Sequence, residues 1–218
     1  EVIRAAEGLP SQSSGLVLAC FNQHFKIDPQ VFAMWTNILH RVPSAVLWLL
    51  SWGGHAVQNL QLELLAAGLH PGRLVVASVL PIEQHLHRAA AADLFLDTLT
   101  YGGHTTAVDA LWMGVPVVSL PGEKMATRVS YSLAAALGCT DMLVATDAPG
   151  YEDLVVRLAQ DAEAMGQLRK CVRRGREESR LYDTGRWVRD VEGKLTVVLR
   201  RHLAGQPPAH IFQNATVA

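Results

Sequence analysis

One segment of the chain combines glycines, hydroxyl side chains and a carboxylate in the order of an anion-binding turn. It covers residues 93–116 and reads DLFLDTLTYGGHTTAVDALWMGVP. Its apolar beginning predicts a strand that ends at about Asp97. Gly102 and Gly103 follow in a loop and would let the backbone approach a ligand closely. The helix predicted to begin next offers unpaired N–H groups and the positive end of its dipole, so the segment predicts a phosphate site.

The polar side chains around this turn fit such a site. The hydroxyls of Thr105 and Thr106 and the imidazole of His104 can donate to phosphate oxygens. Asp109 follows Thr105 by four residues and so lies on the same helix face, where its carboxylate can accept the two hydroxyls of a ribose. A second interpretation stays open at this point: Thr105 caps the helix, and Asp109 interacts only with the helix dipole.

The rest of the chain predicts the elements that hold this turn. Apolar runs of strand length lie at 16–21, 45–50, 74–77, 93–96, 117–120 and 142–145. Helices are predicted at 29–42, 57–67, 82–90, 105–113, 124–137, 151–162, in a second stretch through 174, and at 186–202. This alternation predicts an α/β fold, a Rossmann-like, doubly wound parallel sheet of six strands. We expect one domain over 1–205, helical after about residue 150, and an irregular tail over 206–218.

Composition and charge limit the partners that the chain can have. Of 218 residues, 50% are hydrophobic and 18% are charged, which is typical of a globular protein. Lys plus Arg is 19 and Asp plus Glu is 20, so the net charge of −1 gives no global reason to bind nucleic acid or an acidic membrane. No apolar run reaches the roughly 18 residues of a membrane span. We therefore expect neither nucleic acid nor membrane as a partner.

The cysteines and the first residue carry two further expectations. Cys20, Cys139 and Cys171 form no Cys-x-x-Cys pair, which argues against a zinc site and against a disulfide framework. A reducing compartment is the simpler interpretation. The chain begins with Glu1 and not with Met, which suggests a processed chain or a fragment of a longer protein.

Several motifs resemble a known family. The segment 103–118 follows the pattern G-x-x-(S/T)-x-x-(D/E)-A-L-x-x-G-x-P-V-V, which resembles the donor-binding signature of GT-B sugar-nucleotide glycosyltransferases. The absence of G-x-G-x-x-G argues against a dinucleotide site. Segments 21–29, 41–50 and 122–129 complete a resemblance, over about 8–210, to the protein O-GlcNAc transferase family, particularly its plant-type members. The chain then corresponds to the carboxyl-terminal half of the catalytic region.

The resemblance implies an activity. The family transfers N-acetylglucosamine from UDP-GlcNAc to Ser or Thr hydroxyls of nuclear and cytosolic proteins, with inversion and without a metal or other cofactor. We therefore expect UDP-GlcNAc as co-substrate, Ser/Thr proteins as acceptors, and a cytoplasmic and nuclear location. Without a metal, protein groups must neutralise the leaving diphosphate.

The resemblance also implies roles for individual residues. Lys26 matches the lysine that contacts the diphosphate and stabilises the leaving group, so it is the expected catalytic residue; as a plain sequence feature it is a loop lysine. His85 and Arg88 match uridine-side residues, with the alternative that His85 is a surface histidine. The expected UDP-GlcNAc-binding residues are Gln23, Lys26, Leu80, His85, Arg88, His104, Thr105, Thr106 and Asp109.

The sequence departs from the family pattern in two ways. Ile82 stands where animal members have a lysine, so backbone at Leu80 and Ile82 must recognise uracil; Phe25 replaces a tyrosine, and Tyr101-Gly102 replaces Cys-Asn. The amino-terminal catalytic half and the tetratricopeptide repeats are absent, and no 34-residue period is visible. We therefore expect little or no activity from this chain alone, and apolar surface on helix 186–202 where the missing half would pack.

Two alternatives remain. A protein O-fucosyltransferase of related sequence would use GDP-fucose in place of UDP-GlcNAc. A non-catalytic interaction module with the same fold would bind no nucleotide.

Overall fold

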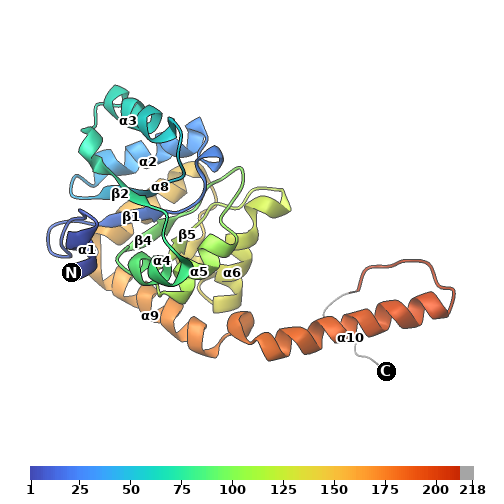
Figure 1. Ribbon diagram of the computed structural model, residues 1–218. Coiled ribbons are helices and arrows are strands. Elements are labelled where there is room, and N and C mark those ends of the chain that lie inside the picture. Colours follow the sequence, from blue (N-terminus) through green and yellow to red (C-terminus); the bar gives the residue numbers. More distant parts are fainter. Residues whose placement is uncertain (212–218) are drawn as a thin grey trace.

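Five short strands form one parallel sheet in the computed structural model, which describes residues 1–211 (Figure 1). The strands are β1 Val17–Cys20, β2 Val46–Ser51, β3 Leu74–Ser78, β4 Leu94–Leu96 and β5 Val117–Val118, in the order β3-β2-β1-β4-β5. β1 lies in the middle, and all four of its residues are buried. A strand covered on both faces needs apolar side chains on both, which explains its unbroken apolar sequence. The predicted Rossmann-like α/β fold is confirmed.

Ten α-helices cover the sheet or extend from it within the described residues. They are α1 Val2–Ala6, α2 Pro29–Arg41, α3 Ala56–Ala66, α4 Ile82–Ala89, α5 Thr105–Trp112, α6 Val129–Leu137, α7 Thr140–Leu143, α8 Ala148–Gln160, α9 Ala162–Glu178 and α10 Thr184–Leu203. Short 3₁₀ turns are η1 His24–Lys26, η2 Pro71–Arg73, η3 Met125–Thr127 and η4 Arg180–Tyr182. Figure 1 shows α2 and α3 on one side of the sheet and α4 and α5 on the other. α8 packs against α2, and α9 packs against α5 and α6.

Local sequence signals set the ends of several helices. Asp28 caps α2, because its Oδ1 accepts the N–H of Val31 at 2.9 Å. Gly138 ends α6 in the left-handed region, with φ 71°, as the predicted helix end requires. These short-range contacts explain why periodicity and capping residues located most helices.

Two predicted elements differ from the structure. The expected sixth strand at 142–145 is wrong: Thr140–Leu143 forms the short helix α7, and only Val144 pairs with the sheet, in a single bridge to Ser119. The helix expected over 124–137 begins only at Val129. Before it, Thr127 Oγ1 donates to the backbone oxygen of Lys124 at 2.7 Å and accepts the N–H of Gly122 at 3.1 Å, which closes a turn.

The last helix extends away from the rest of the molecule in Figure 1. α10 leaves apolar side chains uncovered: Trp187 is 64% exposed, Leu195 60% and Leu203 76%. This confirms the expected apolar surface on this helix. Residues 206–211 have no regular structure, and the remainder of the predicted tail lies outside the described residues. No helix of the described part is both long and apolar enough to cross a membrane.

A buried ion pair ties the first helix to the sheet. α1 was not predicted from the sequence, yet its Arg4 is only 2% exposed and donates to Asp93 Oδ2 at 2.7 Å. The same Asp93 oxygen accepts the N–H of Val17 at 2.8 Å, and its other oxygen accepts from Arg169 of α9 at 2.6 Å. Asp93 therefore connects α1, β1, β4 and α9.

A disulfide bond corrects the expectation drawn from the cysteines. Cys139, at the start of α7, is bonded to Cys171 of α9, with the Cα atoms 6.1 Å apart. The two residues are 32 positions apart in the sequence, and no short spacing motif encodes such a pair. Cys20 is a free, buried thiol.

The disulfide is expected to contribute measurably to stability. Cys171→Ala should lower the free energy of unfolding by about 3–4 kcal/mol, because a cross-link that closes a loop of this length restricts the unfolded chain. Urea unfolding with and without a reducing agent measures the effect. The unchanged chain under reducing conditions should match the variant, and equal stability in all conditions would contradict the expectation.

Candidate functional site

The candidate site lies where the strand order reverses. β1 and β4 are neighbours in the sheet. After β1 the chain turns toward β2, whereas after β4 it turns the other way, toward β5. Their carboxyl ends therefore leave a crevice between diverging loops, the usual ligand position in an open parallel sheet. η1 follows β1, and residues 97–104 lead from β4 into α5. The residues that the sequence singled out come from these two connections and from α4.

A buried asparagine joins the two connections. Asn22, 2% exposed, accepts a hydrogen bond from Thr106 Oγ1 at 2.6 Å and donates to Thr98 Oγ1 at 2.9 Å. Thr98 Oγ1 in turn donates to the backbone oxygen of Tyr101 at 2.6 Å. Asn22 therefore fixes the first turn of α5 against the end of β1. The hydroxyl hydrogen of Thr106 is used in this network, which differs from the expectation that it donates to a phosphate.

A second buried polar residue holds the glycine turn. Asp97 Oδ1 accepts the N–H groups of Gly103 at 2.6 Å and Thr98 at 2.9 Å. Burial raises the pKa of this carboxyl above its ordinary value, while hydrogen bonds, including that from Ser130, act in the opposite direction. A Cβ at Gly103 would lie 2.9 Å from Thr106 Oγ1, so a larger residue there would have to displace that hydroxyl.

Asn22 and Asp97 were not among the binding residues predicted from the sequence. The signal that points to both is their position, since each is a polar residue within two positions of the end of a buried strand. In an open parallel sheet, such positions line the ligand crevice or support it.

The diphosphate-side residues gather around the N-terminus of α5. Lys26 Nζ donates to the backbone oxygen of Gly102 at 3.0 Å. Burial lowers the pKa of Lys26, and the charge of Asp97 raises it in part. His104 Nε2 lies 3.4 Å from the backbone oxygen of Ala126. Thr105 is exposed, and its hydroxyl has no partner among the described residues, so it is free to donate to a ligand.

Gln23 is placed less directly. It is exposed and precedes η1, where its backbone oxygen accepts the N–H of Lys26 at 3.0 Å. Its side chain has no hydrogen bond within the described part of the chain. Its expected contact with the donor stays a prediction.

A cavity of about 200 Å³ lies beside the turn. It is lined by Phe21, Leu50, Trp52, Val79, Leu80, Ile82, His85, Thr106 and Asp109. Four of the predicted binding residues, from three separate segments, therefore meet in one cavity. Ligand clefts commonly measure about 300–1,000 Å³, so this cavity suits one part of a ligand whose remainder extends along the turn. Apolar walls beside a carboxylate suit a base with its ribose.

His85 and Arg88 occupy different places. His85 lines the cavity, and the Phe21 ring meets it edge-on with centroids 4.9 Å apart. Arg88 is 4% exposed and lies behind His85, with its guanidinium 3.3 Å from His85 Nδ1 and 3.5 Å from Glu7. Helical spacing placed both on one face of α4, but only His85 faces the cavity. Arg88 is therefore in a position to hold His85 and not to line the cavity itself.

The pKa of His85 predicts a dependence of stability on pH. Burial, and then the positive charge of Arg88, lower this pKa below its ordinary value. The unfolded chain takes up this proton at about pH 6.5 and the folded chain only at lower pH, so the stability that neutral His85 provides is present above about pH 6.5 and lost as the pH falls through the folded pKa. His85→Gln should flatten the stability curve in that window, as measured by urea midpoints.

The matched control for this measurement is His87→Gln, on the other face of α4. It should keep the slope of the unchanged chain. An equally steep slope in His85→Gln would contradict the expectation.

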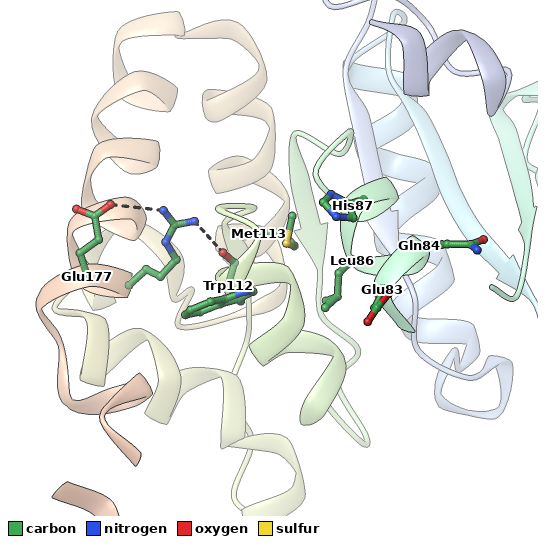
Figure 2. Close-up of a pocket in the computed structure, with 8 residues that line it drawn as sticks. Glu83, Gln84, Leu86, His87, Trp112, Met113 and Glu177 are labelled. Atoms are coloured by element: carbon green, nitrogen blue, oxygen red, sulfur yellow. Dashed lines mark hydrogen bonds and ion pairs between the residues drawn. The ribbon is translucent and has the colours of Figure 1, made fainter. Parts of the chain in front are cut away.

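A larger cavity lies on the opposite faces of α4 and α5. It measures about 850 Å³, and Figure 2 shows Glu83, Leu86, His87, Trp112 and Glu177 around it. Arg176 in this groove donates to the backbone oxygen of Trp112 at 3.0 Å and pairs with Glu177 at 3.4 Å. Its cationic side chain is thus already paired, and none of the predicted site residues lines the groove. Size alone does not identify the site.

The described residues include no group of three or more His, Cys, Asp or Glu side chains placed to hold a metal ion. The expected metal independence stays a prediction.

Comparison with known proteins agrees with this geometry. The model of glycosyl transferase family 41 matches residues 2–191. The chain belongs to this family. The probable UDP-N-acetylglucosamine–peptide N-acetylglucosaminyltransferase SEC of Arabidopsis thaliana is 38% identical over 207 residues, which cover 95% of this chain and 21% of the plant protein. The UDP-N-acetylglucosamine–peptide N-acetylglucosaminyltransferase of Caenorhabditis elegans is 37% identical over 211 residues, 97% of this chain and 18% of the worm protein.

Solved structures support the same assignment to family 41. A mutant of the Thermobaculum terrenum O-GlcNAc transferase superposes with a TM-score of 0.79 and 32% identity, covering 85% of this chain and 36% of that one. Anabaena HepE in complex with UDP has a TM-score of 0.60 at 14% identity, which shows a shared fold alone. The resemblance to O-GlcNAc transferases is confirmed. The chain spans about a fifth of the length of these curated relatives.

Proposed function

We propose that this chain forms the donor-binding half of a protein O-linked N-acetylglucosaminyltransferase. The observation that carries the proposal is the meeting of Lys26, Thr105 and the N-terminus of α5 beside a cavity that His85 and Asp109 line. A cation, a hydroxyl and a helix N-terminus suit a diphosphate. An imidazole and a carboxylate in the neighbouring cavity suit a base and a ribose.

The proposed reaction is an inverting displacement. The hydroxyl oxygen of an acceptor Ser or Thr forms a bond to the anomeric carbon of UDP-GlcNAc, and the bond from that carbon to the β-phosphate oxygen breaks. The electron pair leaves with UDP. Lys26 and the N–H groups at the start of α5 stabilise the charge that develops on the diphosphate. The base that takes the hydroxyl proton belongs to the amino-terminal half, so the chain by itself has little or no transferase activity.

Asp109 and His85 are proposed to hold the nucleoside. Burial raises the pKa of Asp109, and the group remains an acceptor for ribose hydroxyls when ionised. The ring of neutral His85 can stack on a base, and Arg88 orients it from behind. Backbone at Leu80 can pair with the uracil edge.

The location of the activity is also a proposal. The family resemblance favours the cytoplasm and nucleus. The disulfide between Cys139 and Cys171 argues in the other direction, because disulfides persist mainly in oxidising compartments. The redox state of this pair in cells would decide between them.

A thermal-shift titration with UDP, GDP and NAD tests the function. A ligand that binds only the folded chain stabilises it by RT ln(1 + [L]/Kd), or roughly 2.7 kcal/mol at about 100 Kd. UDP should stabilise the chain selectively, and Thr105→Ala should weaken the response because it removes a free donor. Thr184→Ala is the matched control, since Thr184 is also exposed and begins a helix, α10, outside the site.

Other outcomes support the alternatives. A stronger response to GDP than to UDP would favour a fucosyltransferase. Lack of any nucleotide response, also after the amino-terminal half is restored, would leave an interaction module.

A further inference from the structure

Tyr101 lies at the centre of a small cluster beside the phosphate turn. The Lys26 ammonium nitrogen lies 3.9 Å from the centroid of the Tyr101 ring, and it donates to the backbone oxygen of the next residue, Gly102, at 3.0 Å. The His104 ring meets the Tyr101 ring edge-on, with centroids 5.1 Å apart. Phe25 lies on a further side at 6.3 Å. η1, the loop after β4 and the N-cap of α5 therefore converge on one ring.

The ring is anchored by its own backbone. The oxygen of Tyr101 accepts a hydrogen bond from Thr98 Oγ1 at 2.6 Å, and Thr98 is hydrogen-bonded to Asn22. The N–H of Gly102 donates to the backbone oxygen of Ala126 at 3.0 Å. Although Tyr101 is 39% exposed, its loop is hydrogen-bonded on both sides of it. These hydrogen bonds hold the backbone from which the ring projects.

Contact with the Tyr101 ring affects the conformational freedom of the Lys26 side chain. A lysine side chain has four rotatable bonds, so holding its ammonium in one place costs conformational entropy. An aromatic face attracts an ammonium, and a carbonyl beside the ring accepts one of its three hydrogens. When these contacts exist before a ligand arrives, binding no longer carries the full cost of ordering the side chain. The remaining donor capacity of the ammonium is left for a phosphate oxygen.

We propose that Tyr101 is a positioning residue for Lys26. Its ring and the Gly102 carbonyl form a seat that holds the ammonium beside the N-terminus of α5, in place for the diphosphate of a sugar nucleotide. Phe25 lies on another side of the Tyr101 ring in this seat, with the ring centroids 6.3 Å apart. The nature of the ligand rests on the proposed function, whereas the contact between Lys26 and Tyr101 does not.

The contact is tested without any nucleotide. In proton–carbon spectra of the chain labelled at lysine, the ε-methylene protons of Lys26, assigned with Lys26→Arg, should be shifted upfield by the ring. Tyr101→Leu should move them to the position of an exposed lysine, and Tyr101→Phe should leave them shifted. An unchanged resonance in Tyr101→Leu would overturn the inference.

The consequence for binding is tested by calorimetric titration with UDP. Tyr101→Leu should weaken binding about 2- to 5-fold, as expected for loss of an exposed cation–π contact, and Tyr101→Phe should restore it. In a Lys26→Met background, Tyr101→Leu should have no further effect, whereas a general structural role would weaken binding in both backgrounds. Tyr131→Leu is the matched control, because it removes a ring from a separate pair, with Arg128 at 5.1 Å.

The two tests separate two failures. UDP binding without coupling between Tyr101 and Lys26 overturns the inference and leaves the proposed function intact. No UDP binding by the unchanged chain, nor by a longer form with the amino-terminal half restored, refutes the proposed function and with it the diphosphate role of the seat, even where the spectral contact is present.

Discussion

Lys26→Ala is expected to lower kcat about 10²- to 10³-fold in a longer form of the protein that includes the amino-terminal half. Removing one preplaced group that stabilises a developing oxyanion typically has an effect of this size. The Lys26 ammonium lies beside the glycine turn that precedes α5 and donates to the Gly102 carbonyl oxygen at 3.0 Å. Steady-state transfer of radiolabelled sugar from UDP-GlcNAc to an acceptor protein measures the loss.

The control for this experiment is Lys170→Ala. Lys170 is an exposed lysine of α9, and its removal changes the net charge by the same amount. It should leave kcat unchanged. A Lys26→Ala enzyme that loses only affinity for UDP-GlcNAc, with kcat unaltered, would show that the lysine binds the ground state and does not stabilise the leaving group.

Arg4→Met is expected to reduce the free energy of unfolding by about 3–5 kcal/mol. The Arg4 guanidinium is 2% exposed and donates to Asp93 and to the backbone oxygens of Ala91, Pro10 and Gly15. Removing one partner of a buried ion pair leaves the other charge with less compensation, which is the costly case. The variant should melt roughly 6–20 °C lower, and calorimetry or urea unfolding measures the difference.

An exposed ion pair provides the comparison. Arg41 and Asp153 are separated by 2.7 Å, but their side chains are 42% and 68% exposed. Arg41→Met should therefore cost no more than about 1 kcal/mol. Equal losses in the two variants would mean that burial of Arg4 adds nothing to its contribution.

The loss of stability in Arg4→Met should also affect UDP binding. Asp93 lies at the amino end of β4, whereas Asp97 and the glycine turn follow its carboxyl end. Because the Arg4–Asp93 pair lies away from the site, Arg4→Met should weaken UDP binding only through loss of folded protein, with affinity restored at low temperature.

The sequence by itself determined the class of fold, the order of its main elements and the position of the glycine turn that precedes α5. Buried strands are short, apolar and bounded by polar or glycine residues, and helices have capping residues at their own ends. Both kinds of element are therefore encoded by residues that are close together in the sequence. The turn from Gly103 to Asp109 is likewise continuous in the chain. Its motif was enough to indicate the family, which the comparisons confirmed.

Contacts between distant segments were decided only by the tertiary structure. Asn22 meets Thr98 and Thr106, 76 and 84 residues away, because the strand order places β1 beside β4. Sequence spacing cannot show this adjacency. The same holds for Arg4 with Asp93, and for the disulfide between α7 and α9.

The direction of individual side chains and the pairing of the last predicted strand were also decided only by the tertiary structure. Helical spacing placed His85 and Arg88 on one face of α4, but packing against Glu7 turned Arg88 inward and left His85 at the cavity. The segment 142–145 has the apolar character of a strand, yet only Val144 pairs, in a single bridge to Ser119. The direction of a side chain and the partner of a strand depend on residues that are distant in the sequence and become neighbours only when the chain folds.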